Sequence, residues 1–268
     1  MEENKGTFLL AKNLADIFYH IKTVSDLRIV GSCTEFIDPY SKVVSTYGIP
    51  ELQIIDKKER YVDFGPAVTL AQIASMGRTN IPAVLYDAIE ATATGPIRNI
   101  ATLAGNICRE GQKGTLYAPL LALDAELEVK SQSSTRRIKF REFTGIPKSF
   151  VITRIRVPVN DWEVSVFKKI GPENKLSPLS ASFVFLLDTE NDRIVNLKIA
   201  FTGEMVFRSR ELENKLTGYK LPLPEKAIAD FLVAAEELSQ EEFNRSITPP
   251  ILKDQFLNLL EYNLQLLS

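Results

Sequence analysis

The sequence predicts an α+β protein in two parts, and three observations support this. Short helices and strands alternate without a regular pattern as far as Pro158. Three strand-like runs then follow one another, and the chain after them is helical to its end. The turn-forming run at residues 158–161 separates these two parts of the chain. We therefore expect one domain at residues 1–160 and a second at 161–268.

Capping residues and apolar stripes mark the helices of the first part. Asn13 is a good N-cap for a helix whose apolar residues recur at helical spacing. Thr69 can cap a short helix that ends at Met76, and Pro82 suits the first turn of the next helix. A further helix is expected at 116–124.

Strands are expected where β-branched and aromatic residues gather between turn formers. In the first part these runs are Leu27–Val30, Leu52–Ile55, Tyr61–Phe64, Glu126–Lys130, Ile138–Phe143 and Phe150–Val157. In the second part they are Glu163–Ile170, Ser180–Leu187 and Ile194–Phe201, followed by helices at Ser209–Leu216, Glu225–Leu238 and Ile251–Leu267. The run at 188–192 is rich in turn formers and predicts a hairpin between the last two strands.

The composition excludes several classes of partner. The chain has 268 residues, of which 32 are Lys or Arg and 34 are Asp or Glu, for a net charge of −2. A nucleic-acid-binding domain normally carries clustered excess cation, so no nucleic acid partner is expected. No apolar run approaches the roughly 18 residues that span a bilayer. The first residues are polar and acidic, unlike a secretory leader, so we expect a cytoplasmic protein with no membrane contact.

The inventory of metal ligands is small. The chain has one histidine, His20, and two cysteines, Cys33 and Cys108. An iron–sulfur cluster needs about four thiolates, so this chain cannot build one from its cysteines. We interpret His20 as a residue of the surface or core edge, and the cysteines as small buried thiols. Any redox chemistry requires an organic cofactor or metals on another polypeptide.

Two loops of small residues are the most informative feature of the chain. One comprises residues 30–35 and follows a strand-like run, and the other comprises residues 94–108 and contains the helix-breaking pair Gly95-Pro96. Small side chains let backbone N–H groups come close to a bulky anion. Either loop alone is weak evidence for a ligand site, but together they suggest a dinucleotide held at both ends.

The second loop and its continuation closely resemble a known family. Residues 97–108, with the sequence IRNIATLAGNIC, and residues 118–125, with APLLALDA, are similar to the FAD-binding (medium) subunit of molybdenum hydroxylases, the group of xanthine dehydrogenase and carbon monoxide dehydrogenase. The resemblance covers nearly the whole chain, and residues 208–218 resemble that family's C-terminal domain. It implies a two-subdomain FAD-binding fold of the vanillyl-alcohol-oxidase/molybdopterin-dehydrogenase type. The subdomains would span about 1–56 and 57–160, followed by a C-terminal domain of a small antiparallel sheet with helices.

The resemblance also implies a set of cofactor-binding residues. The first loop would line the diphosphate and adenosine side through Ile29, Val30, Gly31, Ser32, Cys33, Thr34 and Glu35. The second loop would contact the diphosphate and flavin side through Thr102, Gly105 and Asn106, and the set is completed by Ile100, Thr115, Ile152 and Lys168. No residue of this chain is expected to be catalytic or to bind a metal.

The function implied by the resemblance is electron transfer. A molybdopterin-binding subunit and a 2Fe–2S subunit would be the partners, and FAD would pass electrons to NAD or another acceptor. The chain departs from the family at residues 111–115, where GQKGT stands in place of Ser-Pro-x-x-Asp, and at Ala104, where the family commonly has glycine. These departures favour an alternative, a cofactor-free scaffold subunit of the same complex. A stand-alone FAD oxidase is disfavoured because such enzymes usually supply their own base, and His20 lies away from both loops.

Overall fold

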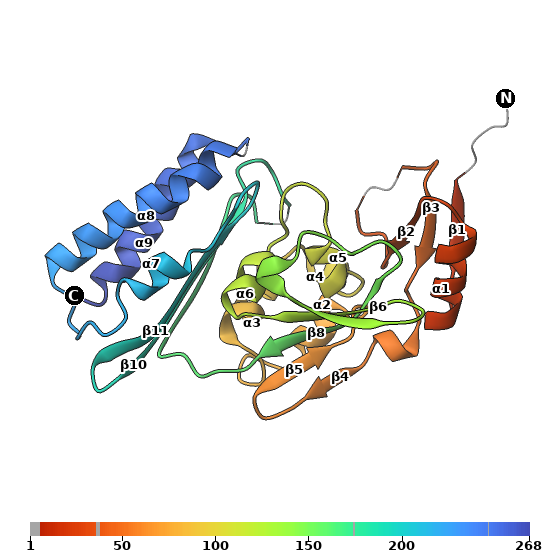
Figure 1. Ribbon diagram of the computed structural model, residues 1–268, viewed down its shortest axis with the longest axis horizontal. Helices are drawn as coiled ribbons and strands as arrows, with labels where there is room; N and C mark the ends of the chain where they lie inside the picture. Colours follow the sequence, from red (N-terminus) through yellow and green to blue (C-terminus); the bar gives the residue numbers. More distant parts are fainter. Residues whose placement is uncertain (1–5, 36–37, 174, 246) are drawn as a thin grey trace. The chain divides into compact units, whose positions relative to one another are not determined.

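The computed structural model describes residues 6–35, 38–173, 175–245 and 247–268 (Figure 1). Contacts divide the chain into two compact units that do not follow sequence order. Unit 1 comprises residues 1–81, 94–108 and 124–159, and unit 2 comprises residues 82–93, 109–123 and 160–268. Both small-residue loops, residues 30–35 and 94–108, therefore belong to unit 1.

The first sheet of unit 1 has three parallel strands in the order β1-β3-β2. They are β1 (Thr7–Leu10), β2 (Leu27–Val30) and β3 (Lys42–Ser45). Helix α1 (Leu14–Thr23) begins after Asn13, whose side chain accepts a hydrogen bond from the Asp16 backbone N–H at 2.9 Å. The predicted N-cap is therefore confirmed, and the apolar stripe of α1 packs with β3 around the fully buried Ile17 and Val44.

The second sheet of unit 1 has five antiparallel strands in the order β4-β5-β8-β6-β7. They are β4 (Ile55–Lys57), β5 (Tyr61–Phe64), β6 (Glu126–Lys130), β7 (Thr135–Lys139) and β8 (Val151–Pro158). The short helices α2 (Leu70–Ala74), α4 (Gly95–Arg98) and α5 (Leu103–Ile107) complete this unit. Thr69 caps α2 in a reciprocal capping box with Gln72, as predicted.

Two strand predictions in unit 1 are wrong. Residues 52–55 do not form a strand, because Pro50 starts a 3₁₀ turn (Pro50–Leu52) and the strand β4 begins only at Ile55. The strand expected at 138–143 ends at Lys139, and Phe140–Glu142 forms a second 3₁₀ turn that buries Phe140. An apolar run does not distinguish a short strand from a buried turn.

Unit 2 contains a four-stranded antiparallel sheet in the order β12-β11-β10-β9. The strands are β9 (Val164–Ile170), β10 (Ala181–Glu190), β11 (Arg193–Thr202) and β12 (Val206–Phe207). The predicted hairpin is confirmed: Asn191 and Asp192 join β10 to β11 with φ of 51° and 61°. Two consecutive positive φ angles are typical of the tight turns whose twist matches that of paired strands.

Helices cover both faces of this sheet. The helices α7 (Arg210–Asn214), α8 (Glu225–Arg245) and α9 (Pro250–Gln265) lie on one face (Figure 1). The helices α3 (Ala83–Glu90) and α6 (Tyr117–Ala122) come from the earlier segments of unit 2. They pack against the strands β9, β10 and β11. Seven consecutive residues of β10, from Ala181 to Leu187, are accordingly buried. The helix predicted from Glu225 is present and continues to Arg245.

Candidate functional site

The two small-residue loops meet at Thr102. A Cβ atom added to Gly31 of the first loop would lie 3.2 Å from the Thr102 hydroxyl oxygen, and one added to Gly105 would lie 3.1 Å from the same oxygen. Contacts this short are tighter than almost all that real Cβ atoms make. Both glycines therefore sit against one threonine side chain, and the structure brings together the two loops that the sequence suggested as a pair.

The second loop is held by its own hydrogen bonds. Thr102 is the N-cap of α5, and its hydroxyl accepts the Gly105 backbone N–H at 3.1 Å. Thr102 also forms an isolated antiparallel bridge with Thr69, and the Leu70 N–H donates to the Ala101 carbonyl at 2.9 Å. The start of α5 is thus tied to the start of α2. This fixes the backbone of the loop without any bulky side chain.

The first loop is anchored through its carbonyl groups. The Val30 carbonyl accepts from the Thr46 backbone N–H at 2.8 Å, and the Gly31 carbonyl accepts from the Ser45 hydroxyl at 3.0 Å. Cys33 then adopts a left-handed backbone conformation with φ of 53°. The Ser32 hydroxyl oxygen is buried and has no hydrogen-bond partner in the part of the chain that the structure describes. A buried hydroxyl of this kind is suited to an external polar ligand, because leaving it unpaired is costly.

The expected cofactor-binding residues fall into two groups. Unit 1 holds those of both loops and Ile152, a residue of β8 whose side chain is 2% exposed. Within this group Ile29, Val30 and Asn106 are half-buried, whereas Cys33, Thr34, Glu35, Ile100 and Gly105 are exposed. Unit 2 holds Thr115, which is buried, and Lys168, which is exposed on β9. A role in cofactor binding stays a prediction for all of these residues.

Two expectations about the loops need correction. The prediction that Cys33 is a buried thiol is wrong, because its side chain is exposed on a residue with a left-handed backbone. Cys108 is half-buried. The pair Gly95-Pro96 does not break a helix but starts one, the single turn α4, since the fixed φ of proline fits the first helical turn.

The segment at residues 111–115 is clamped inside unit 2. The Gln112 side chain is buried and donates from Nε2 to the carbonyls of Ser177 and Ser180, at 2.5 and 2.9 Å. The next residue, Lys113, donates its backbone N–H to the Gly203 carbonyl at 2.7 Å. Sequence reasoning missed Gln112, because a glutamine in a polar loop gives no signal that its amide is buried.

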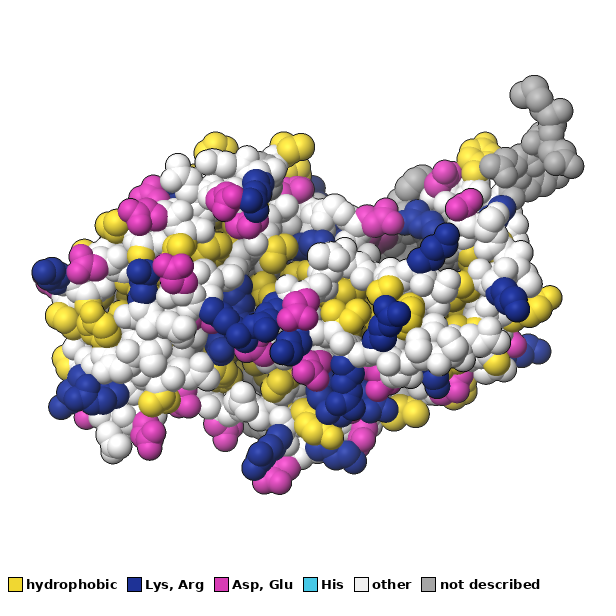
Figure 2. Space-filling model, in the orientation of Figure 1, with side chains coloured by type: hydrophobic (Ala, Val, Ile, Leu, Met, Phe, Trp, Pro, Cys, Tyr) yellow, Lys and Arg dark blue, Asp and Glu magenta, His cyan; other side chains and the backbone are white. Residues whose placement is uncertain are grey.

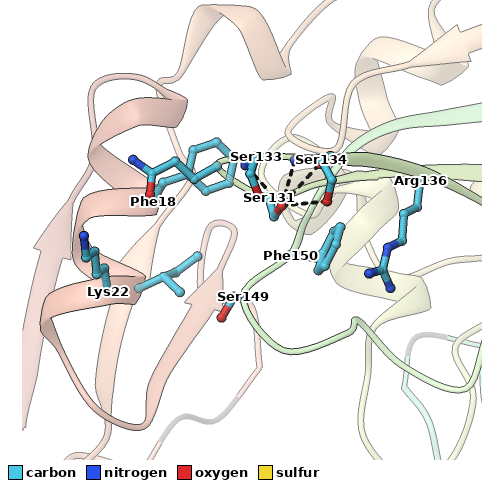
Figure 3. A pocket seen from close by; sticks show the side chains of 10 residues that line it. Phe18, Lys22, Ser131, Ser133, Ser134, Arg136, Ser149 and Phe150 are labelled. Atoms are coloured by element: carbon cyan, nitrogen blue, oxygen red, sulfur yellow. Dashed lines mark hydrogen bonds between the residues drawn. The ribbon is translucent and has the colours of Figure 1, made fainter.

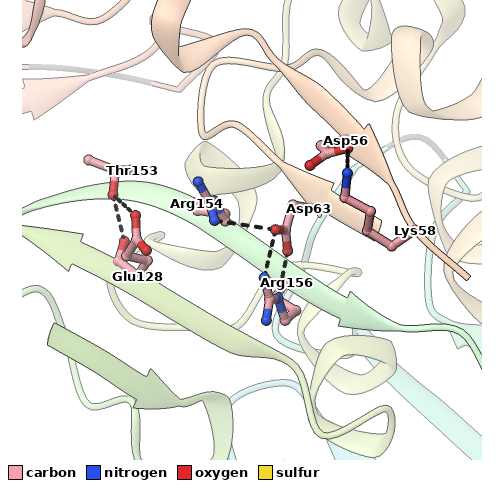
Figure 4. Close-up of polar contacts among 7 residues, drawn as sticks. All are labelled: Asp56, Lys58, Asp63, Glu128, Thr153, Arg154 and Arg156. Carbon is pink, nitrogen blue, oxygen red and sulfur yellow. Dashed lines mark hydrogen bonds and ion pairs between the residues drawn. The ribbon is translucent and has the colours of Figure 1, made fainter. Parts of the chain in front are cut away.

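A charged cluster lies on the five-stranded sheet of unit 1 (Figure 4). The Asp63 carboxylate accepts two hydrogen bonds from Arg156, at 2.8 and 2.9 Å, and forms an ion pair with Arg154 at 3.4 Å. The hydrogen bonds to Asp63 raise the pKa of Arg156. Arg156 also stacks 3.7 Å from the centre of the Tyr61 ring. Because its partners are mutually satisfied, this cluster ties β5 to β8 and offers no free acid or base.

Among the described residues, no group of three His, Cys, Asp or Glu side chains could hold a metal ion. No helix in the same part of the chain is long and apolar enough to cross a membrane. On the face drawn in Figure 2, Lys and Arg side chains lie interspersed with Asp and Glu side chains.

Comparisons with known proteins define the class of this protein. Residues 4–160 match the family described as the FAD binding domain in molybdopterin dehydrogenase. This match covers more than half of the chain, so the chain belongs to that family, as the resemblance predicted. It is an FAD-binding component of an oxidoreductase of the molybdenum hydroxylase family.

Individual relatives are similar over different lengths. The nicotine 6-hydroxylase medium subunit of Paenarthrobacter nicotinovorans is 29% identical over 215 residues, which is 74% of this chain and 72% of that one. The xanthine dehydrogenase FAD-binding subunit of Escherichia coli O157:H7 is 32% identical over 154 residues, 56% of this chain and 50% of that one. The chain thus matches about half the length of the second relative.

Solved structures confirm the fold. A Cu,Mo-CO dehydrogenase chain superposes with a TM-score of 0.80 at 18% identity, covering 98% of this chain and 97% of that one. A chain of quinoline 2-oxidoreductase from Pseudomonas putida 86 superposes with a TM-score of 0.78 at 17% identity, covering 100% and 96%. The predicted α+β FAD-binding fold with its C-terminal sheet and helices is therefore correct.

Proposed function

We propose that this chain is the electron-transfer subunit of a xanthine dehydrogenase-like molybdenum hydroxylase. It would accept electrons from 2Fe–2S clusters on a partner subunit and pass them through FAD to NAD or another acceptor. The observation that carries the proposal is the meeting of the two small-residue loops at Thr102. Their contact leaves glycines, a hydroxyl group and backbone amides at one place in unit 1, which suits an elongated anionic cofactor.

The residues of unit 1 have distinct roles in this proposal. Gly31 and Gly105 make room for the Thr102 side chain where the loops meet, because neither carries a Cβ atom there, and the cofactor diphosphate would approach the loop backbone at this point. The Ser32 hydroxyl, buried and without a partner among the described residues, donates a hydrogen bond to the diphosphate. Thr102 keeps both loops in register through its cap on α5. Bound FAD supplies the redox chemistry, and the chain supplies binding and orientation.

The partner arrangement is proposed from the relatives. Two relatives that are similar in sequence are named as a medium subunit and an FAD-binding subunit, that is, as components of larger enzymes. We extend this division of labour to the present chain, with molybdopterin and 2Fe–2S clusters held by partner subunits. The small inventory of one histidine and two cysteines is consistent with metals being carried elsewhere.

Reconstitution with FAD tests the proposal. The purified full chain is mixed with FAD, passed through a desalting column and examined for flavin absorbance and for the FAD-to-protein ratio. We expect about one FAD per chain with a dissociation constant in the micromolar range or tighter. A folded chain that stays colourless at millimolar FAD would refute the proposal.

The scaffold alternative keeps one observation in its favour. Thr115 stands where the family pattern has an aspartate, and its side chain is only 3% exposed. If the chain has lost the cofactor, a complex purified from its native source would contain molybdenum and iron but no flavin. Measuring all three in the same preparation distinguishes the two functions, because the electron-transfer subunit predicts flavin in proportion to the chain.

A further inference from the structure

A hollow in unit 1 has the features of a binding site for a small organic molecule (Figure 3). It has a volume of about 380 Å³. Its walls are α1, the turn between β6 and β7 at residues 131–134, the strand β7 and the residues just before β8. Small-ligand sites typically have volumes of roughly 300–1,000 Å³. The hollow is thus large enough for a molecule of one or two rings.

This hollow is separate from the loops that meet at Thr102. Lys22, on its wall, precedes the strand β2, whereas Gly31 follows the same strand. Four strand residues span about 13 Å. None of the residues that line the hollow belongs to either small-residue loop. The proposed FAD site therefore does not account for it.

The lining carries positive charge without a compensating acid. Lys22 from α1 and Arg136 from β7 both line the hollow, and none of its described lining residues is Asp or Glu. The Arg136 guanidinium lies 4.5 Å from the centre of the Phe150 ring. This cation–π contact orients the guanidinium on an aromatic surface, where it can pair with an anion.

The remaining walls combine a pre-formed polar turn with apolar surface. The Ser131 hydroxyl accepts the Ser134 backbone N–H at 3.1 Å and lies 3.0 Å from the Ser134 hydroxyl oxygen. The turn is therefore held by its own side chains before any ligand arrives. Phe18 and Phe150 line the hollow from two different elements and offer ring surface.

We propose that this hollow binds a small organic anion with a flat apolar body. Its carboxylate or phosphate group pairs with Arg136 and Lys22, and its ring packs against Phe150 and Phe18. The serine hydroxyls of the 131–134 turn hydrogen-bond to the remaining oxygens. This site lies within the FAD-binding chain but does not depend on FAD being bound.

Four probes test the proposal on the full chain. Benzoate and phenyl phosphate carry both a ring and an anionic head, whereas benzyl alcohol lacks the charge and inorganic phosphate lacks the ring. Saturation-transfer NMR and two-dimensional amide spectra would measure binding, with and without FAD. We expect benzoate or phenyl phosphate to bind at least tenfold more tightly than either truncated probe, and to shift the amide signals of Ser133 and Phe150. The stronger of the two identifies the head group.

Substitutions connect the binding to the hollow. Arg136→Gln and Lys22→Gln change exposed side chains and should each weaken binding at least fivefold, whereas the control Lys58→Gln, at an exposed lysine paired with Asp56, should leave it unchanged. Ser133→Ala provides a variant without any charge change, and it should weaken binding about twofold. Equal affinity for the charged and uncharged ring probes, or unchanged affinity in both cation variants, would overturn the proposal. Loss of FAD binding with retained benzoate binding would count against the proposed function alone.

Discussion

The interior of unit 2 is filled by aromatic rings, whereas the loops of unit 1 meet around one threonine with a glycine on each side. Phe256 of α9 packs against four other phenylalanines, with ring centres 5.2–6.4 Å away. At Thr102, by contrast, two neighbours lack side chains altogether. The difference separates packing that stabilises the fold from a close approach of two loops that requires glycine at both contacts. Substitutions in the two regions should therefore change different quantities.

The largest expected effect comes from emptying the aromatic core. Phe256→Ala removes a fully buried ring and should lower the free energy of unfolding by about 3–5 kcal/mol. Denaturant unfolding followed by circular dichroism measures it. Tyr262→Ala, on the same helix but 58% exposed, is the matched control and should cost less than about 0.5 kcal/mol. Similar losses for the two variants would contradict the described packing.

A smaller effect is expected at the clamp on residues 111–115. Gln112→Ala leaves the carbonyls of Ser177 and Ser180 without their side-chain donor, and it should cost about 1–3 kcal/mol of unfolding free energy. The exposed Gln53, changed to alanine, serves as the reference in the same denaturation assay. A Gln112→Ala protein as stable as this reference would show that the clamp carries no stabilisation.

Substitutions in the loops of unit 1 should change the affinity for FAD. A methyl group at Gly31 or Gly105 crowds the Thr102 hydroxyl, so Gly31→Ala and Gly105→Ala should each weaken FAD binding about tenfold, or roughly 1.4 kcal/mol. Gly95→Ala adds the same methyl group where nothing lies within 4 Å and is the control. Fluorescence titration of FAD gives the three affinities. Equal affinities would mean that the contact of these glycines with Thr102 does not shape the FAD site.

The smallest effect concerns a partly buried cation in unit 2. Burial lowers the pKa of Lys169 below its ordinary value of 10.5, and its Nζ donates to the Ala91 carbonyl at 3.1 Å. The unfolded chain then binds more protons than the native chain as the pH approaches 10.5, so stability should rise with pH in that window. Urea midpoints of the natural chain and of Lys169→Met are measured across this pH window. With rising pH, the midpoint of the natural chain should increase relative to that of the variant. Parallel curves would exclude this contribution.

Much of the fold follows from local signals. Asn13, Thr69 and Pro82 mark helix starts, and the turn formers before Arg193 predict the hairpin of β10 and β11. The strands β1 and β3 were not predicted, and their parallel pairing joins segments far apart in the sequence, with Thr7 opposite Lys42.

The sequence predicts the two loops of the site but not the contact between them at Thr102. Gly31 and Gly105 stand out as small residues near turn formers, yet their common neighbour is fixed by tertiary packing. The burial of Gln112 and the partnerless hydroxyl of Ser32 likewise depend on residues far along the chain. Hydrophobic periodicity carries no information about contacts of this kind.

A crystal structure of the full chain with bound FAD would test the proposed site most directly. We predict that the diphosphate lies against Gly31, Ser32 and Gly105, with Thr102 between the loops and the Ser32 hydroxyl paired to a phosphate oxygen. A diphosphate bound elsewhere, with side chains of the chain itself occupying the place where the loops meet, would contradict it.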